Sequence, residues 1–297
     1  MEELGKKIRV SHRINDDALD INNLSQYSLF LSVEDKNLRV AVVDVGEKKC
    51  MVLEDYRFSG VVSRQDTIQQ LNTVLEGHLV LRAGYWGEVA LIARNGGFSY
   101  IPEAYFDETQ KSSYLHFHPN SLENMDLYSY CHSSSALYNV FQVEREFVAW
   151  AKKAYPNKDI KILHQADVFL ASALKETSAD YETNIFIDIE NRYMNMLIVQ
   201  GERILLYNRY YYQSPQDFVY FLLFAIDELQ INNDTLQVLL YGEISKDSGI
   251  FNLMQKYIKN VDFGKRKREM SFSYKFDDVL DHRYFDLYNA YDCLLKS

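Results

Sequence analysis

Cysteine is scarce in this sequence. Cys50, Cys131 and Cys293 lie far apart in the 297 residues and form no CxxC pair. This pattern excludes a disulfide framework and a cysteine-rich zinc site, and it is typical of the reducing cytoplasm. Proline and glycine are also rare, with 4 and 12 residues, too few for a linker-rich or low-complexity chain. We therefore expect a globular cytoplasmic protein.

Excess positive charge and long apolar runs are missing as well. The 32 basic and 42 acidic residues give a net charge of −10. A general nucleic-acid binder needs a basic footprint, so we expect no nucleic-acid partner. Residues 1–20 contain many charged side chains and lack the apolar stretch of a signal peptide. The longest apolar run, Phe218–Ile226, falls far short of the roughly 20 residues that a membrane-spanning helix needs, and it predicts a core-facing helix.

Tyrosine, in contrast, is abundant, with 23 residues. Its apolar ring and polar hydroxyl suit half-buried strands as well as interfaces. The sequence leaves two interpretations open. One is a tyrosine-rich sheet, and the other is a surface that binds a protein partner or a second copy of the chain.

The order of the predicted elements occurs twice. In the first half, three strands at 27–33, 38–45 and 49–58 are separated by short polar turns, and a helix at 65–76 and a strand at 88–94 follow. In the second half, strands are expected over 184–189, 193–199 and 203–211, a helix over 214–229 with Ser214 as its N-cap, and a strand over 236–241.

This order predicts an α/β fold of two tandem ribonuclease H-like domains, each a mixed five-stranded sheet flanked by helices, which is the actin-like ATPase architecture. The expected domains are 1–181, with a β-hairpin insertion around 114–142, and 182–297. The C-terminal helix is a candidate for packing back on the first domain.

Four segments resemble the pilus-assembly M-type proteins of the actin-like superfamily: 162–171, Ile185–Ile189, Leu205–Arg209 and Val238–Glu243. In that group an apolar strand ending in Asp-Ile-Gly is followed by a hairpin with an Arg-bearing strand, and a later strand ends in two glycines beside the adenosine. The whole chain also resembles an uncharacterised bacterial family, a domain of unknown function, to which this fold is assigned. The resemblance implies an interdomain cleft for a nucleotide.

The first phosphate turn departs from that pattern. Backbone amides approach a phosphate closely only where glycine leaves room for them. The corresponding turn in the first domain has no glycine, and a serine stands where the resemblance implies an aspartate. The candidate cleft residues of this domain are Ser32, Glu34, Asp35 and Lys36.

The second domain departs in part. Asp188 is retained, but Glu190 stands at the glycine position and Asn191 follows it. At the adenosine motif Gly242 is present, and Glu243 replaces the second glycine. Carboxylates at Glu34 and Glu190 would repel a phosphate unless a metal bridged the charges. The candidate cleft residues of the second domain are Asp188, Glu190, Asn191, Gly242 and Glu243.

The function predicted from these departures is a degenerate actin-like protein that works as a binding or assembly module without ordinary ATP hydrolysis. The alternative is a divergent ATPase that uses Mg²⁺ and ATP, in which Asp188 orients a metal-bound water and Gly242 admits the base. A third hypothesis is a metal-dependent nuclease that combines Asp188 and Glu243 with Asp217, Asp227 or Glu228.

Two histidines also have metal-ligand spacing. His116 and His118 would lie on one face of an expected strand at 114–118, and His132 is a candidate third ligand. No acid or cysteine accompanies them in the pattern. A structural or surface role is the favoured interpretation, and a zinc site is the alternative.

Overall fold

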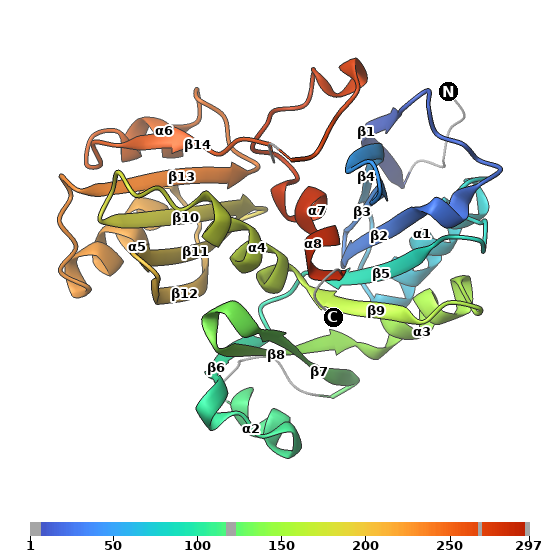
Figure 1. Cartoon of the computed structure of the whole chain (residues 1–297), viewed down its shortest axis with the longest axis horizontal. Helices are drawn as coiled ribbons and strands as arrows, with labels where there is room; N and C mark the ends of the chain where they lie inside the picture. Colours follow the sequence, from blue (N-terminus) through green and yellow to red (C-terminus); the bar gives the residue numbers. More distant parts are fainter. Residues whose placement is uncertain (1–6, 117–122, 267–268, 295–297) are drawn as a thin grey trace. The chain divides into compact units, whose positions relative to one another are not determined.

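The computed structural model describes residues 7–116, 123–266 and 269–294. The chain divides into two compact units (Figure 1), and each is described by itself. Unit 1 contains residues 1–168, 269–278 and 287–297, and unit 2 contains 169–268 and 279–286. The division at 168 falls before the expected boundary at 181, and the last residues of the chain belong to unit 1.

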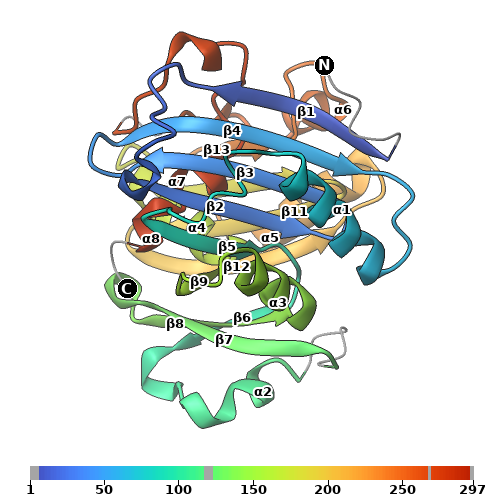
Figure 2. The ribbon, with the colours of Figure 1, turned by 90° about the vertical axis from the view of Figure 1, so that its right-hand side faces the viewer.

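Unit 1 is built on a six-stranded mixed sheet in the order β1-β4-β3-β2-β5-β9 (Figure 2). β2, β3 and β4 are antiparallel, and β5 and β9 add parallel to β2. The sheet has one strand more than expected because β1 pairs with β4 at the edge. The bounds are β1 (Ile8–Asn15), β2 (Tyr27–Glu34), β3 (Asn37–Asp44), β4 (Lys49–Phe58), α1 (Arg64–Glu76), β5 (Glu88–Ala93), α3 (Arg145–Ala154) and β9 (Ile160–His164).

A separate three-stranded sheet, in the order β6-β8-β7, lies between β5 and α3 in the chain. The expected insertion around 114–142 contains the β7–β8 hairpin, but Phe98–Pro102 also pairs with β8 as β6. The strand expected at 114–118 is wrong for its described part, because Tyr114 ends helix α2 and a turn follows. The bounds are β6 (Phe98–Pro102), α2 (Lys111–Tyr114), β7 (Met125–His132) and β8 (Leu137–Glu144).

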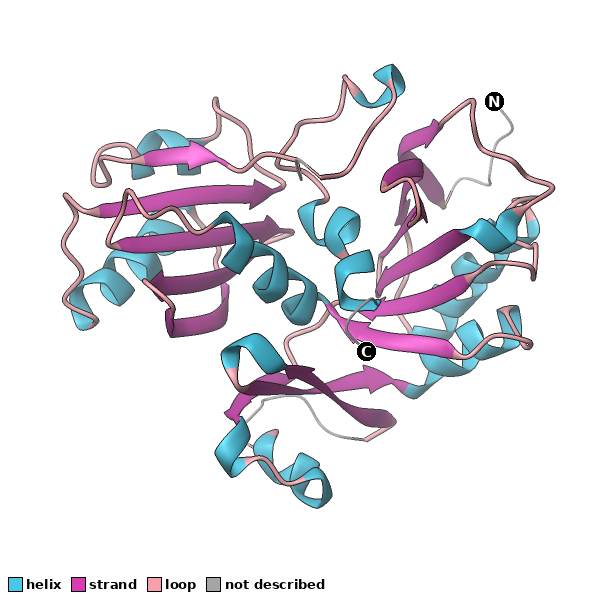
Figure 3. Ribbon diagram, in the orientation of Figure 1, coloured by secondary structure: helices cyan, strands magenta, loops and turns pink. Residues whose placement is uncertain are grey.

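Unit 2 repeats the main arrangement with five strands, in the order β12-β11-β10-β13-β14 (Figure 3). The mixed α/β class with two ribonuclease H-like sheets is therefore as predicted. The bounds are β10 (Thr183–Glu190), β11 (Tyr193–Gln200), β12 (Arg203–Tyr211), α5 (Pro215–Glu228), β13 (Leu236–Gly242), α6 (Gly249–Met254) and β14 (Val261–Phe263). The division between the units falls within α4 (Gln165–Ala173) and α7 (Phe285–Asn289), and α8 (Tyr291–Leu294) belongs to unit 1.

The two faces of the unit 2 sheet carry different side chains. Ile185, Ile187 and Ile189 of β10 pack in one apolar cluster with Phe218 and Leu222 of α5. Because side chains alternate along a strand, Phe186 and Asp188 point to the opposite face. Every residue of β10 is buried, as expected for a central strand covered on both faces.

The start of α5 follows from its sequence. The side chain of Ser214 accepts a hydrogen bond from the backbone N–H of Asp217, whose carboxylate accepts one from the Ser214 N–H. This reciprocal capping box satisfies amide groups that have no partner within the helix. Pro215 occupies the first turn, where its missing N–H does no harm. The predicted N-terminus of this helix is confirmed.

A buried carboxylate joins the extra strand β1 to the sheet. Glu54 of β4 is fully buried and accepts a hydrogen bond from the Tyr56 hydroxyl at 2.5 Å. His78 Nε2 lies 3.1 Å from Glu54 Oε1, and Arg13 of β1 lies 3.4 Å from the same oxygen. Burial acts to raise the pKa of Glu54, but these hydrogen bonds and the Arg13 charge outweigh it and hold the pKa below the usual 4.5.

The lowered pKa predicts an acid-sensitive contribution to stability. A depressed folded-state pKa adds stability above the unfolded-state value, and this is lost as the pH falls through the folded-state value. Glu54→Gln should therefore cost about 1–3 kcal/mol at pH 7 and much less near pH 3. Urea unfolding at both pH values measures the difference. Glu76→Gln, at an exposed residue of α1, is the control. Equal losses for Glu54→Gln at the two pH values would contradict this account.

Candidate functional site

The predicted cleft residues of unit 1 lie together where β2 turns into β3. Ser32 is fully buried within β2 and is paired in register with Arg39. Glu34 ends the strand, and Asp35 and Lys36 form a two-residue turn before Asn37. The turn contains no glycine.

Glu34 is held by an arginine that the sequence analysis did not single out. Arg94 follows β5, and its buried guanidinium donates to Glu34 Oε2 at 2.9 Å. The same guanidinium donates to Asn37 Oδ1 at 2.8 Å, and the Asn37 amide donates to Asp55 at 2.7 Å. The end of β2 is therefore tied to β5, β3 and β4 by a buried chain of charged and polar groups.

The turn itself is held from α1. Arg64 makes an ion pair with Asp35 and a second one with Glu144 at 3.2 Å. The Asp35 carbonyl accepts a hydrogen bond from Thr67 Oγ1 at 2.8 Å. Burial, reinforced by the nearby Asp35 charge, raises the pKa of Glu144 in spite of Arg64.

The carbonyl of the next residue is also engaged, because Lys36 accepts a hydrogen bond from the Phe58 N–H at 2.8 Å. Carboxylates and carbonyl groups therefore dominate this turn, and two arginines already bind its carboxylates. Such a turn lacks the open, glycine-lined amides that cradle a phosphate.

The predicted cleft residues of unit 2 lie at the ends of β10 and β13. Asp188 accepts a hydrogen bond from the Asn195 amide at 3.3 Å, on the sheet face opposite α5. Glu190 is buried as the last residue of β10. Asn191 and Arg192 form the following turn with positive φ angles of 51° and 109°, a left-handed backbone that glycine adopts far more readily.

Gly242 makes the tightest backbone approach in this part of the site. Its φ is +83°, and a Cβ built there would lie 2.2 Å from the Ile189 carbonyl oxygen and 2.7 Å from Asp188 Oδ1. The N–H of Glu243 donates to the same Ile189 carbonyl at 2.7 Å. The Glu243 carboxylate lies 3.7 Å from the Arg283 guanidinium. Asp188, Gly242 and Glu243 are therefore neighbours.

In unit 1, Glu34, Asp35 and Lys36 form the β2–β3 turn and Ser32 precedes them in β2; the five residues of unit 2 lie at the ends of two paired strands. That the two sets line one cleft stays a prediction. Arg94, Arg64, Asn37 and Arg283 were not predicted from the sequence. Of these, Arg94 had a usable signal, because a charged residue stands directly after the apolar strand β5.

The nuclease hypothesis is wrong on geometry. Asp217, Asp227 and Glu228 all belong to α5, which packs on the face of the sheet that carries Ile187. Asp188 points to the opposite face, so the sheet separates it from these three carboxylates. Among the described residues no group of three or more His, Cys, Asp and Glu side chains is placed to hold a metal ion.

The expected strand that would have aligned the histidines is wrong in its described part. His116 lies in the turn after α2, not on a strand, and His118 is outside the described residues. His132 is buried, and its Nε2 lies 2.9 Å from Asp167 Oδ1. Burial raises the pKa of Asp167 against the opposing effect of this contact. The pair joins β7 to α4, which is a structural role.

Comparison with solved structures identifies the fold. A Bacteroides thetaiotaomicron protein described as having an actin-like ATPase fold and unknown function is 16% identical, covers 94% of this chain and 99% of its own, and has a TM-score of 0.77. The PilM–PilN type IV pilus biogenesis complex gives 13% identity, 90% and 98% coverage, and a TM-score of 0.59. The chain therefore has the actin-like ATPase fold.

The family follows from the sequence. Residues 16–261 match the family described as "Protein of unknown function (DUF3822)", and the chain belongs to that family. No protein of curated function matches it. In the described residues, no helix is both long and apolar enough to cross a membrane.

The Arg94 network makes a first prediction for this site. Arg94→Met leaves the partly buried Glu34 carboxylate without this guanidinium, so we expect a loss of about 3–5 kcal/mol in the free energy of unfolding. Adding Glu34→Gln should recover a large part of it, which a double-mutant cycle in urea measures. The exposed pair Arg145–Asp126 is the control, and Arg145→Met should cost less than about 1 kcal/mol. Additive losses for Arg94 and Glu34 would contradict the coupling.

Gly242 makes a second prediction. Gly242→Ala combines an unfavourable positive φ with a backbone clash, so the free energy of unfolding should fall by more than about 2 kcal/mol. Gly201 has a φ of +58° and open space around a built Cβ, so Gly201→Ala reports the backbone term alone. Chemical denaturation of both variants separates the two terms. Equal losses would show that the contact with Ile189 and Asp188 contributes nothing.

Proposed function

We propose that this chain is a degenerate actin-like protein that works as a binding or assembly module and does not carry out ordinary ATP hydrolysis. The observation that carries the proposal is the β2–β3 turn of unit 1. Glu34 is bound by Arg94 and Asp35 by Arg64, and the turn contains no glycine. A nucleotide phosphate would meet carboxylates whose neutralising cations are already engaged.

Electrostatics makes this arrangement unfavourable for ATP. Like charges at contact distance interact by about 4 kcal/mol even at an effective dielectric constant of 20. Moving Arg94 to a phosphate would remove its hydrogen bonds to Glu34 and Asn37. A phosphate would therefore gain little net binding free energy from Arg94.

A protein partner is the second part of the proposal. One neighbour in fold is a complex of PilM with PilN, which supports a protein partner. The tyrosine-rich composition supplies residues that favour interfaces. We place the protein in the cytoplasm, which is supported by three free cysteines.

A divergent ATPase is the second candidate, and one observation favours it. Asp188, at the end of β10, lies against Gly242, at the end of β13. Under this proposal Asp188 would orient a water bound to Mg²⁺, and Gly242 would leave space for the base. Gly242 also has a packing reason to be glycine, so the candidate depends mainly on Asp188.

Thermal unfolding of the full chain tests the proposal. A ligand present at 100 times its dissociation constant stabilises the native state by about 2.7 kcal/mol, which raises the melting temperature by roughly 2–4 °C per kcal/mol in a chain of this size. We expect no nucleotide-specific shift with millimolar ATP, ADP or GTP and Mg²⁺. A shift of several degrees that Asp188→Asn abolishes would overturn the binding-module proposal and support the ATPase.

A further inference from the structure

Helix α5 of unit 2 is apolar on all sides through its middle. The run Phe218–Ile226 contains no charged residue, and Tyr220 supplies its one hydroxyl group. One side of the helix, including Phe218 and Leu222, packs into the core of unit 2. A helix that is apolar all round is normally covered on all sides. The outer side of α5 therefore needs an explanation.

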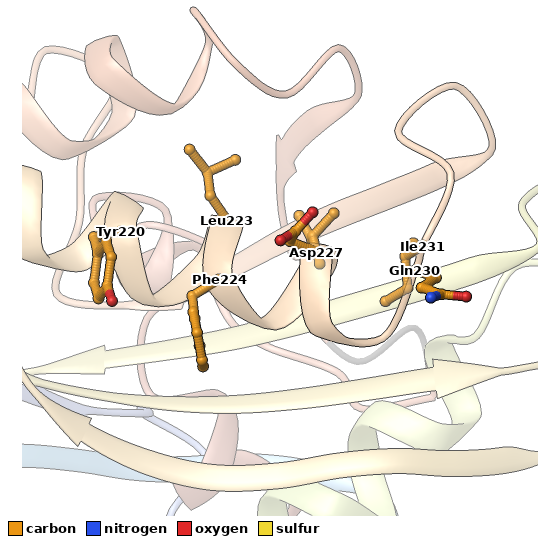
Figure 4. A pocket seen from close by; sticks show the side chains of 7 residues that line it. Tyr220, Leu223, Phe224, Asp227, Gln230 and Ile231 are labelled. Carbon is orange, nitrogen blue, oxygen red and sulfur yellow. The ribbon is translucent and has the colours of Figure 1, made fainter.

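That outer side exposes two aromatic rings. Tyr220 and Phe224 are 61% and 50% exposed, and their rings stack with centroids 5.9 Å apart. Figure 4 shows the two rings on the same side of the helix, one turn apart, and Leu223 on the other side. We call Tyr220, Phe224 and Asp227 the α5 patch; together with Leu223, Ile226, Gln230 and Ile231 they line an open hollow.

The spacing of the α5 patch favours a helical partner. Positions 220, 224 and 227 follow the i, i+4, i+7 repeat along one side of α5. These three positions span eight residues of the helix, or about 10 Å at 1.5 Å per residue. The backbone groups of α5 are engaged within the helix, so the surface offers side chains only. This matches a helix laid into a groove and not an added strand.

The charges around the α5 patch indicate which charge a partner helix would carry. Residues 215–231 contain three carboxylates, Asp217, Asp227 and Glu228, and no lysine or arginine. Two copies of α5 packed antiparallel would bring acidic ends against acidic ends, which disfavours self-association here. An anionic lipid surface is disfavoured for the same reason. Basic side chains at the flanks of the partner would be complementary.

We propose that the α5 patch docks an amphipathic helix of a partner protein, with apolar side chains against Tyr220 and Phe224 and with lysine or arginine beside Asp227 and Glu228. The inference rests on the proposed function as a binding module and names the class of partner. All residues of the α5 patch belong to unit 2.

A displayed library of random 20-residue peptides, selected on the purified full chain, tests the inference. The enriched peptides should carry apolar residues at helical spacing with flanking lysine or arginine. Fluorescence anisotropy of the best synthetic peptide should show at least tenfold weaker binding to Tyr220→Lys/Phe224→Lys and weaker binding to Asp227→Lys. Tyr85→Lys, at a tyrosine that is 79% exposed outside the patch, should bind as the unmodified chain does.

Four outcomes would overturn the inference. These are no enrichment at all, enriched peptides that are acidic or lack helical spacing, binding that the patch variants leave unchanged, and a dimer in sedimentation that Phe224→Lys converts to monomer. Because the replaced residues are exposed, unchanged circular dichroism and melting temperature are expected to verify folding. Nucleotide binding is a separate readout, so the failure of this inference and the failure of the proposed function are distinguishable.

Discussion

The ion pair between Arg94 and Glu34 is the constraint on which the account of unit 1 depends. The Arg94 side chain is fully buried, and a buried guanidinium is tolerated only when carboxylates and other acceptors surround it. Glu34 and Asn37 supply them at the end of β2 and the start of β3. A glycine-rich turn that receives a phosphate cannot at the same place supply these acceptors. The proposal is therefore that this turn has a structural role in place of phosphate binding.

In unit 2 the two residues that match the resemblance, Asp188 and Gly242, also have structural roles. Gly242 has no room for a Cβ beside the Ile189 carbonyl and Asp188. Asp188 in turn accepts a hydrogen bond from Asn195 on the neighbouring strand. Their presence is thus explained by the packing of β10 against β13 and β11. A resemblance in these two positions is weak support for nucleotide chemistry, whereas the ion pairs of unit 1 support the proposed role as a binding module.

Much of the fold could be predicted from the sequence because its signals are local. The hairpins follow from short polar turns between β-rich runs, and α5 begins where Ser214, Pro215 and Asp217 predict. Strand β6 was missed because it has only five residues, ends in Pro102 and pairs only with β8. The strand expected at 114–118 was wrong because that stretch carries β-forming residues but has no strand to pair with in its described part.

The candidate site was less predictable than the fold. The sequence located the turn at Glu34 and Asp35, but Arg94 and Arg64 approach it from distant parts of the chain, and such pairings have no local signal. Side chains alternate between the two faces of β10, so Asp188 points away from α5. The nuclease hypothesis grouped carboxylates without regard to this alternation. His132 likewise required the tertiary structure, because its partner Asp167 belongs to α4.

Isothermal titration calorimetry of the full chain with Mg²⁺ and ATP tests the central claim most directly, since it measures binding without relying on hydrolysis or unfolding. The account predicts no saturable heat up to millimolar ATP for the unmodified chain. Saturable binding with a dissociation constant below about 100 μM (roughly −5.5 kcal/mol), lost in Asp188→Asn, would contradict it.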